Sequence, residues 1–307
     1  MSRWPALTPH TCTRIGTAPW KLRRLVSIGV CLIVGLLITP QVHAAVTLRT
    51  IPVGVGHAPR AAFSSELPVI PLETSAELLG ASWQGSTDHI MIRVRRGAGL
   101  WGPWMTLTAE VAEGPDATSD EFHGAAIHRV PTPVWVGHAT NVMVRVPRGA
   151  TVHHLNIIAV DAPRQTGDAT MQGRVALPSG RQPTAPQVQT RAQWGADESI
   201  RRANPSYADG IVAAVVHHTV NGNTYARGDV PAIIRGIYAY HVKTNGWNDI
   251  GYNFLIDRFG RVWEGRYGGI TKAVIGAHTG GFNTHTTGMA LICLLYTSPS
   301  PRDQRGS

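Results

Sequence analysis

The alternation of hydrophobic and polar residues predicts a β-rich region between residues 76 and 160. Short segments rich in Val, Ile, Thr and Trp are separated there by turn residues such as Gly97-Ala98-Gly99. In residues 90–96 apolar and cationic side chains alternate, which predicts a strand with one buried face. Several short strands at this spacing are typical of an antiparallel sandwich or barrel, so we expect an all-β sandwich-like domain. The expected strands are residues 78–83, 89–95, 104–107, 134–136, 141–146 and 152–160.

A different pattern begins after residue 190 and predicts an α/β domain. Residues 211–216 (IVAAVV) form a continuous apolar run, which predicts a strand buried on both faces. Apolar residues then recur at helical spacing, from a candidate N-cap at Asp229 to a stop at Asn245-Gly246. Further strands are expected at residues 252–256 and 261–264, which flank a hairpin turn, and at 288–292. We therefore expect a central mixed β-sheet with flanking helices.

The two ends of the chain differ from the rest in composition. Residues 1–24 are polar and cationic, residues 25–38 carry no charge, and Val42-His43-Ala44 offers small residues two apart. This pattern predicts a secretory signal peptide, residues 1–44, and therefore a secreted, cell-wall-associated protein. A retained membrane anchor is the alternative, although a span needs about twenty apolar residues. The other expected segments are a β-rich domain at 45–162, a polar linker at 163–189, the α/β domain at 190–292 and a tail at 293–307.

The formal net charge of +9 does not indicate a nucleic-acid partner. Seven of the cations and one acid lie outside residues 45–292, which leaves 21 Lys and Arg against 18 Asp and Glu. The excess within this region is small, so we expect no nucleic-acid binding. Residues 45–292 also contain no cysteine, which predicts a fold without disulfides.

Three residues of the second region suggest hydrolytic chemistry. His217 ends the apolar run, Tyr252 starts a later strand, and His278 lies in a glycine-rich loop. A histidine at the end of a strand is often only a hydrogen-bonded core residue. Two histidines and a tyrosine together suit a zinc hydrolase, in which metal-bound water attacks and a phenol stabilises the oxyanion.

Five motifs carry a resemblance to a known family. They are RAQWGAD (191–197), VVHHT (215–219), AYHVKTNGWNDIGYNFLID (239–257), GRVWEGR (260–266) and GAHTGGFNTHTTGMALI (276–292). In this order they resemble the peptidoglycan recognition proteins, which include the type 2 N-acetylmuramoyl-L-alanine amidases. The resemblance covers about one third of the chain and implies a Zn2+-dependent hydrolysis. The bond cleaved would be the amide between N-acetylmuramic acid and L-alanine of peptidoglycan.

The resemblance also assigns roles to residues of this sequence. His217 matches a zinc ligand, and Tyr252 matches the catalytic tyrosine. The positions that match the lining of the peptidoglycan groove are His241, Trp247, Arg266, His278 and Asn283. The expected partner is peptidoglycan in the form of a muramyl peptide, bound by a monomer without a stable membrane span after signal cleavage.

Structural explanations of the same residues stay open. Arg266 has Asp249 or Asp257 as possible partners, and His241 suits a buried hydrogen bond. Trp194 and Trp247 suit packing as well as contact with a substrate. The same choice applies to Trp101, Trp104 and Trp135, which form either part of a core or a platform for sugars. His153 and His154 are expected at the surface or in the core, and His285 is expected at the surface.

The sequence departs from the family pattern at its end. The family's two other zinc ligands lie downstream of the last motif, whereas residues 293–307 read CLLYTSPSPRDQRGS, which we interpret as a non-native tail. We therefore expect a C-terminally truncated amidase domain that binds zinc weakly and hydrolyses little. A non-catalytic peptidoglycan-binding module is the alternative.

Overall fold

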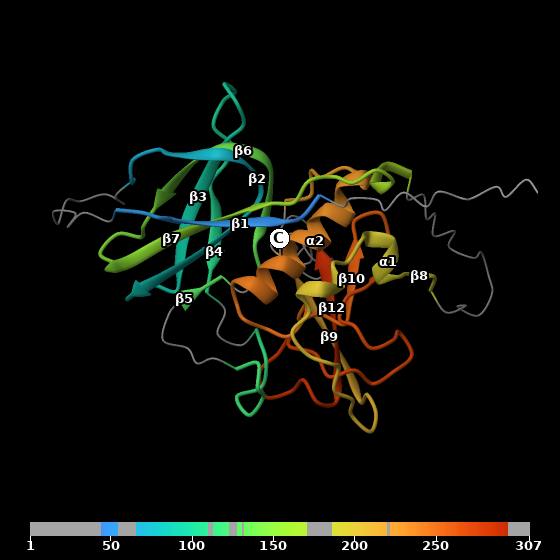
Figure 1. Cartoon of the computed structure of the whole chain (residues 1–307). Coiled ribbons are helices and arrows are strands. Elements are labelled where there is room, and N and C mark those ends of the chain that lie inside the picture. Colours follow the sequence, from blue (N-terminus) through green and yellow to red (C-terminus); the bar gives the residue numbers. More distant parts are fainter. Residues whose placement is uncertain are drawn as a thin grey trace, which may run out of the picture. The chain divides into compact units, whose positions relative to one another are not determined.

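The computed structural model describes residues 44–54, 66–109, 113–122, 128–130, 132–170, 186–219 and 222–293. All of these residues belong to one compact unit. They form two β-sheets with the helix α2 beside both of them (Figure 1). The predicted signal peptide up to residue 43, residues 171–185 of the predicted linker and the predicted tail after Cys293 lie outside the described residues. In the described segments no helix has the length and hydrophobicity needed to cross a bilayer.

The first sheet has seven antiparallel strands in the order β1-β7-β2-β6-β3-β4, with β5 paired to β2. The strands are β1 (Thr47–Pro52), β2 (Ile70–Gly85), β3 (His89–Arg95), β4 (Met105–Thr108), β5 (His128–Arg129), β6 (Val134–Arg145) and β7 (Val152–Asp161). The predicted strands 134–136 and 141–146 are one strand, β6. Gly137 and His138 have positive φ angles of 58° and 53°, yet the strand continues through them. The expected antiparallel β-structure is present, although hydrogen bonds join the strands into one sheet.

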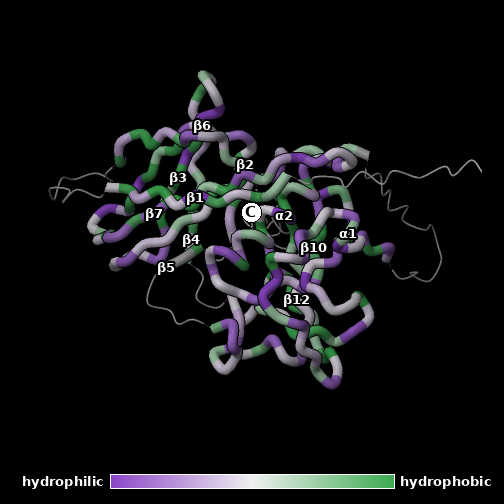
Figure 2. The backbone as a smooth tube through the Cα atoms, in the orientation of Figure 1, coloured by the Kyte–Doolittle hydropathy of each residue, from purple (hydrophilic) through white to green (hydrophobic). Residues whose placement is uncertain are grey.

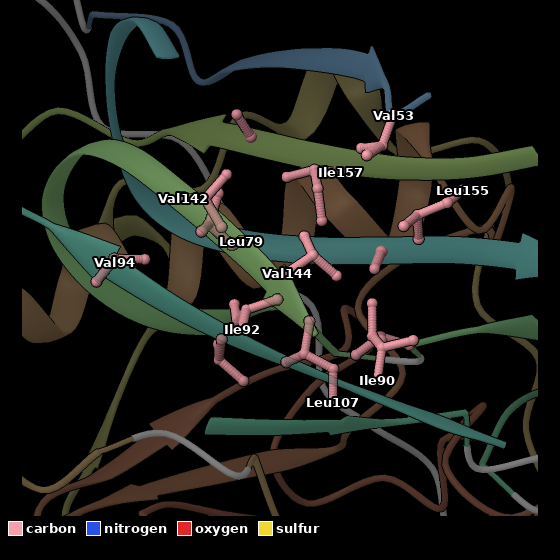
Figure 3. Close-up of a cluster of buried hydrophobic side chains, with 14 of the residues drawn as sticks. Val53, Leu79, Ile90, Ile92, Val94, Leu107, Val142, Val144, Leu155 and Ile157 are labelled. Carbon is pink, nitrogen blue, oxygen red and sulfur yellow. The ribbon is translucent and has the colours of Figure 1, made fainter. Parts of the chain in front are cut away.

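Apolar side chains from both ends of this sheet share one core. Figure 3 shows Leu155 and Ile157 of β7 and Ile90 and Ile92 of β3 directed into the same interior. Leu107 of β4 joins them, and all five are almost fully buried. The alternation predicted in residues 90–96 is confirmed by the burial pattern of β3.

The second sheet has five strands in the order β8-β11-β10-β12-β9. The strands are β8 (Val188–Gln189), β9 (Ala213–His218), β10 (Phe254–Asp257), β11 (Val262–Glu264) and β12 (Thr286–Ile292). The β10–β11 pair is antiparallel and the other pairs are parallel, so the expected mixed sheet is present. The turn between β10 and β11 is closed by Asp257, whose carboxylate accepts hydrogen bonds from the backbone of Phe259 and Arg261.

The prediction of a fully buried strand at residues 211–216 is wrong. β9 lies at the edge of its sheet and pairs with β12. Val212 is 82% exposed and Val216 is 59% exposed. The error arises because an apolar run indicates burial only where other elements cover both faces, and the described residues leave β9 open.

Helix α2 (Val230–Lys243) is buried on all sides up to Val242. Its side chains form a core with residues of β2, β7, β10 and β12, and Figure 2 shows hydrophobic residues concentrated in this region. Contact with β2 is close: a Cβ on Gly236 would lie 2.4 Å from Leu78 Cδ1, and one on Gly80 would lie 2.3 Å from Tyr240 Cε2. The helix begins where expected. Asp229, however, makes no side-chain capping bond to it and instead accepts a hydrogen bond from the backbone of Ala226.

Short helical elements complete the described chain: η1 (Asp168–Thr170), α1 (Arg191–Trp194), η2 (Glu198–Ile200) and η3 (Arg227–Asp229). η1 falls inside the predicted linker and is packed against α2. Asp168 forms a buried ion pair with Arg235, with Oδ2 2.6 Å from Nη2. The first residues of the predicted linker are therefore fixed to the core.

Candidate functional site

The histidines and the tyrosine singled out in the sequence come together in the structure. His217 lies near the end of β9, His278 in the loop before β12, and Tyr252 two residues before β10. His217 Nε2 is 3.0 Å from His278 Nδ1, and the rings of His217 and Tyr252 have centroids 5.6 Å apart. The predicted convergence of these three side chains is therefore observed.

His278 is held in a tight cavity beneath β12. Gly288 makes room for it, since a Cβ at that position would lie 2.3 Å from the imidazole ring. The hydroxyl of Thr286 donates to the Phe282 carbonyl and accepts a hydrogen bond from His278 Nε2, which leaves His278 Nδ1 as an acceptor facing His217. Burial, followed by the nearby His217, lowers the pKa of His278 to about 4. His278 is therefore neutral at pH 7.

A second set of hydrogen bonds reaches Tyr252 from α2. The backbone N–H of Gly251 donates to His241 Nδ1, so the proton of the neutral ring is on Nε2. This proton faces Thr132 Oγ1 at 3.0 Å, and the same Oγ1 is 2.8 Å from the Tyr252 hydroxyl. His241 thus makes the buried hydrogen bond that was the alternative to a substrate contact, and it helps to position Tyr252 through Thr132.

Arg266 has a different partner from those considered in the sequence. It forms two hydrogen bonds with Glu121, at 2.8 Å and 2.7 Å, and both side chains are buried. The expected partners are engaged elsewhere, because Asp249 pairs with Arg191 and Asp257 pairs with Arg261. The pairing of Arg266 with Asp249 or Asp257 is therefore wrong.

Carboxylates from the first half of the chain also reach His217, Tyr252 and Asn283. Glu113 lies 3.2 Å from both His217 Nδ1 and the Tyr252 hydroxyl. Asp116 Oδ1 accepts a hydrogen bond of 2.7 Å from Asn283 Nδ2. These acids and Glu121 lie in residues 113–122 (EGPDATSDEF), which we call the acidic segment.

Sequence reasoning missed the acidic segment and Thr132. The one available signal was the concentration of four acids and no base in the ten residues of the segment. This signal was not enough, because the sequence does not show which residues face these acids. Beside the segment a pocket of about 210 Å³ remains, lined in part by Glu121, Arg266 and Tyr267.

The predicted zinc ligand does not form a metal site in this arrangement. The ring nitrogens of His217 face two different groups, His278 on one side and Glu113 on the other. A zinc ion needs at least three donors directed at one point, and among the described residues no such group of His, Cys, Asp or Glu is present. The residues that the structure describes therefore do not fit a zinc ion.

The tryptophans divide into buried and partly covered residues. Trp194 is fully buried and donates a hydrogen bond to the Glu264 carbonyl, which confirms packing. Trp247 is also buried and lies beside His241, with ring centroids 4.5 Å apart.

Trp101, Trp104 and Trp135 do not form an open platform. Trp135 belongs to the core around α2. Trp101 and Trp104 lie outside the core clusters, and the guanidinium of Arg93 stacks 5.3 Å and 4.6 Å from their ring centroids. His285 is exposed as expected, and His153 and His154, for which surface and core were both open, are exposed as well.

Two regions of the chain match known proteins. Residues 58–187 match the family described as Rv3811 N-terminal galactose-binding domain-like. Peptidoglycan-recognition protein SC1a/b of Drosophila simulans is 36% identical over 107 residues, which are 34% of this chain and 54% of that protein. The chain thus spans about half the length of this curated relative.

Solved structures give related matches. Bumblebee PGRP-SA is 32% identical, with a TM-score of 0.33, and the match covers 39% of this chain and 70% of that one. Peptidoglycan recognition protein-LE, solved in complex with tracheal cytotoxin, is 30% identical with a TM-score of 0.30, and 34% of this chain and 59% of that one are covered. From the shared sequence, the chain belongs to the peptidoglycan recognition protein family.

Proposed function

We propose that the groove formed by His217, Tyr252, Arg266 and Asn283 binds the muramyl peptide of peptidoglycan. The observation that carries this proposal is the convergence of His217, Tyr252 and His278, which come from three separate segments of the family-related region. In the described structure His217, Tyr252, Arg266 and Asn283 contact carboxylates of the same chain. A stem peptide also ends in a carboxylate, so it offers these side chains the same kind of group. Peptidoglycan lies outside the cytoplasmic membrane, so a protein that binds it must be exported. The proposal therefore agrees with the secretory signal predicted for residues 1–44.

Arg266 is the main specificity residue in this proposal. Its guanidinium is held by the carbonyls of Ile250 and Ile275, at 3.0 Å and 3.2 Å, and two of its nitrogens point together at one carboxylate. A planar guanidinium fixed in this way recognises a carboxylate by two parallel hydrogen bonds. The stem-peptide carboxylate is the matching group of the ligand.

Hydrolysis of the amide between N-acetylmuramic acid and L-alanine is the second candidate. Tyr252 favours it, because its hydroxyl is fixed by Thr132 next to His217 and can donate a hydrogen bond to a developing oxyanion. We assign no step to a metal, since the described residues form no zinc site. Release of the free peptide from a muramyl tripeptide, followed chromatographically with and without added zinc, tests this candidate.

The binding proposal is tested by changing the ligand and the protein together. Calorimetric titration compares a muramyl tripeptide that has a free carboxylate with the same compound as its amide. The wild type is expected to bind the carboxylate form about tenfold more tightly, and Arg266→Gln is expected to lose this preference. Arg148→Gln, a change at an exposed turn, is the matched control and keeps the preference. The proposal is contradicted if Arg266→Gln keeps the wild-type preference for the carboxylate form, or if the wild type binds neither compound.

A further inference from the structure

The acidic segment contacts Arg266 and Asn283, which the family resemblance assigns to substrate, and it also contacts His217 and Tyr252. Its acids at positions 113, 116 and 121 face the groove, while Asp120 is exposed. The contacts of the segment are long-range, with sequence separations of 104 to 169 residues. The segment therefore belongs to the first half of the chain but occupies the proposed binding site of the second.

Glu113 occupies the centre of the site. One carboxylate oxygen lies 3.2 Å from His217 Nδ1, and the other accepts a hydrogen bond of 3.2 Å from the Tyr252 hydroxyl. His217 Nε2 donates to His278 at the same time, so both ring nitrogens and the phenol are engaged. A ligand that uses His217 or Tyr252 must first displace this carboxylate.

Asp116 and the neighbouring backbone occupy the loop before β12. Asn283 donates from its side-chain amide to Asp116 at 2.7 Å and to the Gly114 carbonyl at 2.9 Å. The backbone N–H of Gly281 donates to the same Asp116 oxygen at 2.7 Å. Gly114 also lies against Trp247, with its φ of 147° in a region that favours glycine.

Glu121 pairs with the residue that we propose for carboxylate recognition. It receives two hydrogen bonds from Arg266 and a third from the backbone of Asn248 at 3.0 Å. This is the bidentate geometry in which an arginine binds the carboxylate of a peptide. The pocket of about 210 Å³ left beside it is smaller than the roughly 300–1,000 Å³ of typical ligand sites.

These contacts are not needed to join the two halves of the chain. The apolar core around α2 already joins the sheets, through residues such as Leu78, Tyr240 and Leu255. The acidic segment adds mainly polar and charged contacts, and each of its three inward carboxylates meets a residue of the proposed site.

We infer that the acidic segment is an intramolecular competitor of the muramyl peptide. It places three carboxylates on the groups that would bind the ligand, and it keeps the groove closed until a ligand displaces it. This inference rests on the proposed function, because it takes the groove to be the muramyl-peptide site. The apparent affinity is then the intrinsic affinity multiplied by the fraction of molecules in which the segment has left the groove.

The test compares the full chain with a variant that keeps the shape of the segment but removes its inward charges. In Glu113→Gln/Asp116→Asn/Glu121→Gln the affinity for a muramyl tripeptide, measured by calorimetry, is expected to rise about tenfold or more. Asp120→Asn removes an exposed charge from the same segment and is expected to leave the affinity unchanged. Thermal unfolding of all three proteins shows whether they are folded.

Hydrogen exchange on the unmodified protein gives a second measurement. Adding the muramyl tripeptide is expected to increase deuterium uptake in residues 113–122, because their hydrogen bonds to the groove are lost. The inference is overturned if the wild type and the triple variant bind the muramyl tripeptide tightly and with equal affinity, and if deuterium uptake in the segment does not change. That result leaves the proposed function intact. No binding to either protein overturns the proposed function and the inference with it.

Discussion

Substitution of Gly80 by alanine tests the close approach of β2 to α2. A Cβ on Gly80 would lie 2.3 Å from Cε2, 2.5 Å from the hydroxyl oxygen and 2.6 Å from Cζ of Tyr240. The Tyr240 ring is fully buried, and its hydroxyl donates a hydrogen bond of 3.0 Å to the Val130 carbonyl. The added methyl group can therefore be accommodated only if the ring moves away and this hydrogen bond lengthens or breaks.

The expected cost follows from these two changes. Overpacking a filled core costs about 1–3 kcal/mol, and loss of a buried hydrogen bond adds about 1 kcal/mol. Gly80→Ala should therefore lower the free energy of unfolding by about 2–4 kcal/mol, although the same change at an open position is close to neutral. Tyr240→Phe, which removes the hydroxyl alone, should cost about 1 kcal/mol.

Urea unfolding followed by circular dichroism measures these differences as shifts of the midpoint at constant slope. Gly54→Ala is the matched control, because among the described residues only Gly54 itself and its chain neighbours lie within 4 Å of a Cβ at that position. It is expected to change the free energy by less than about 0.5 kcal/mol. A Gly80→Ala protein as stable as this control would refute the packing argument.

Two further predictions concern buried charge. Arg191→Met removes the guanidinium that pairs with Glu198 and Asp249. The buried Asp249 carboxylate, whose pKa is already raised by burial, then lacks this partner. Thermal unfolding should show that the free energy of unfolding falls by about 3–5 kcal/mol, and the double variant Arg191→Met/Asp249→Asn should recover part of this loss. Because the pKa of His278 falls from 6.5 to about 4 on folding, the unfolded chain binds the extra proton between these values, and stability should drop by up to about 3 kcal/mol as the pH is lowered from 7 to 4. Urea titrations at pH 7 and 4 measure this loss, which should shrink in His278→Gln. An unchanged pH dependence would show that other groups cause it.

Local patterns in the sequence predicted the elements that depend on neighbouring residues. β3, the turn closed by Asp257 and helix α2 are found where alternation, turn residues and helical spacing indicated them. The meeting of His217, Tyr252 and His278 was also expected, because family motifs marked all three. The outcome for β9 was different, since burial depends on which elements cover a strand rather than on its own composition.

The acidic partners of the site could not be predicted in this way. Glu113 is separated from Tyr252 by 139 residues, and Glu121 from Arg266 by 145 residues. No periodicity links segments so far apart, and the motifs that indicate the groove contain no information about the preceding region. For the same reason the sequence suggested the wrong partners for Arg266, since it favoured acids close to it along the chain.

The burial of α2 on all sides has a practical consequence for anyone who works with fragments of this protein. The helix follows residues 171–185 in the chain, yet Leu78, Ile158 and Val160 of the preceding region form part of its packing. A fragment that begins after those residues would expose Ile233, Ile237 and Tyr240 to water, and it would tend to precipitate during purification. Crystallisation and ligand screening therefore need both halves on one polypeptide.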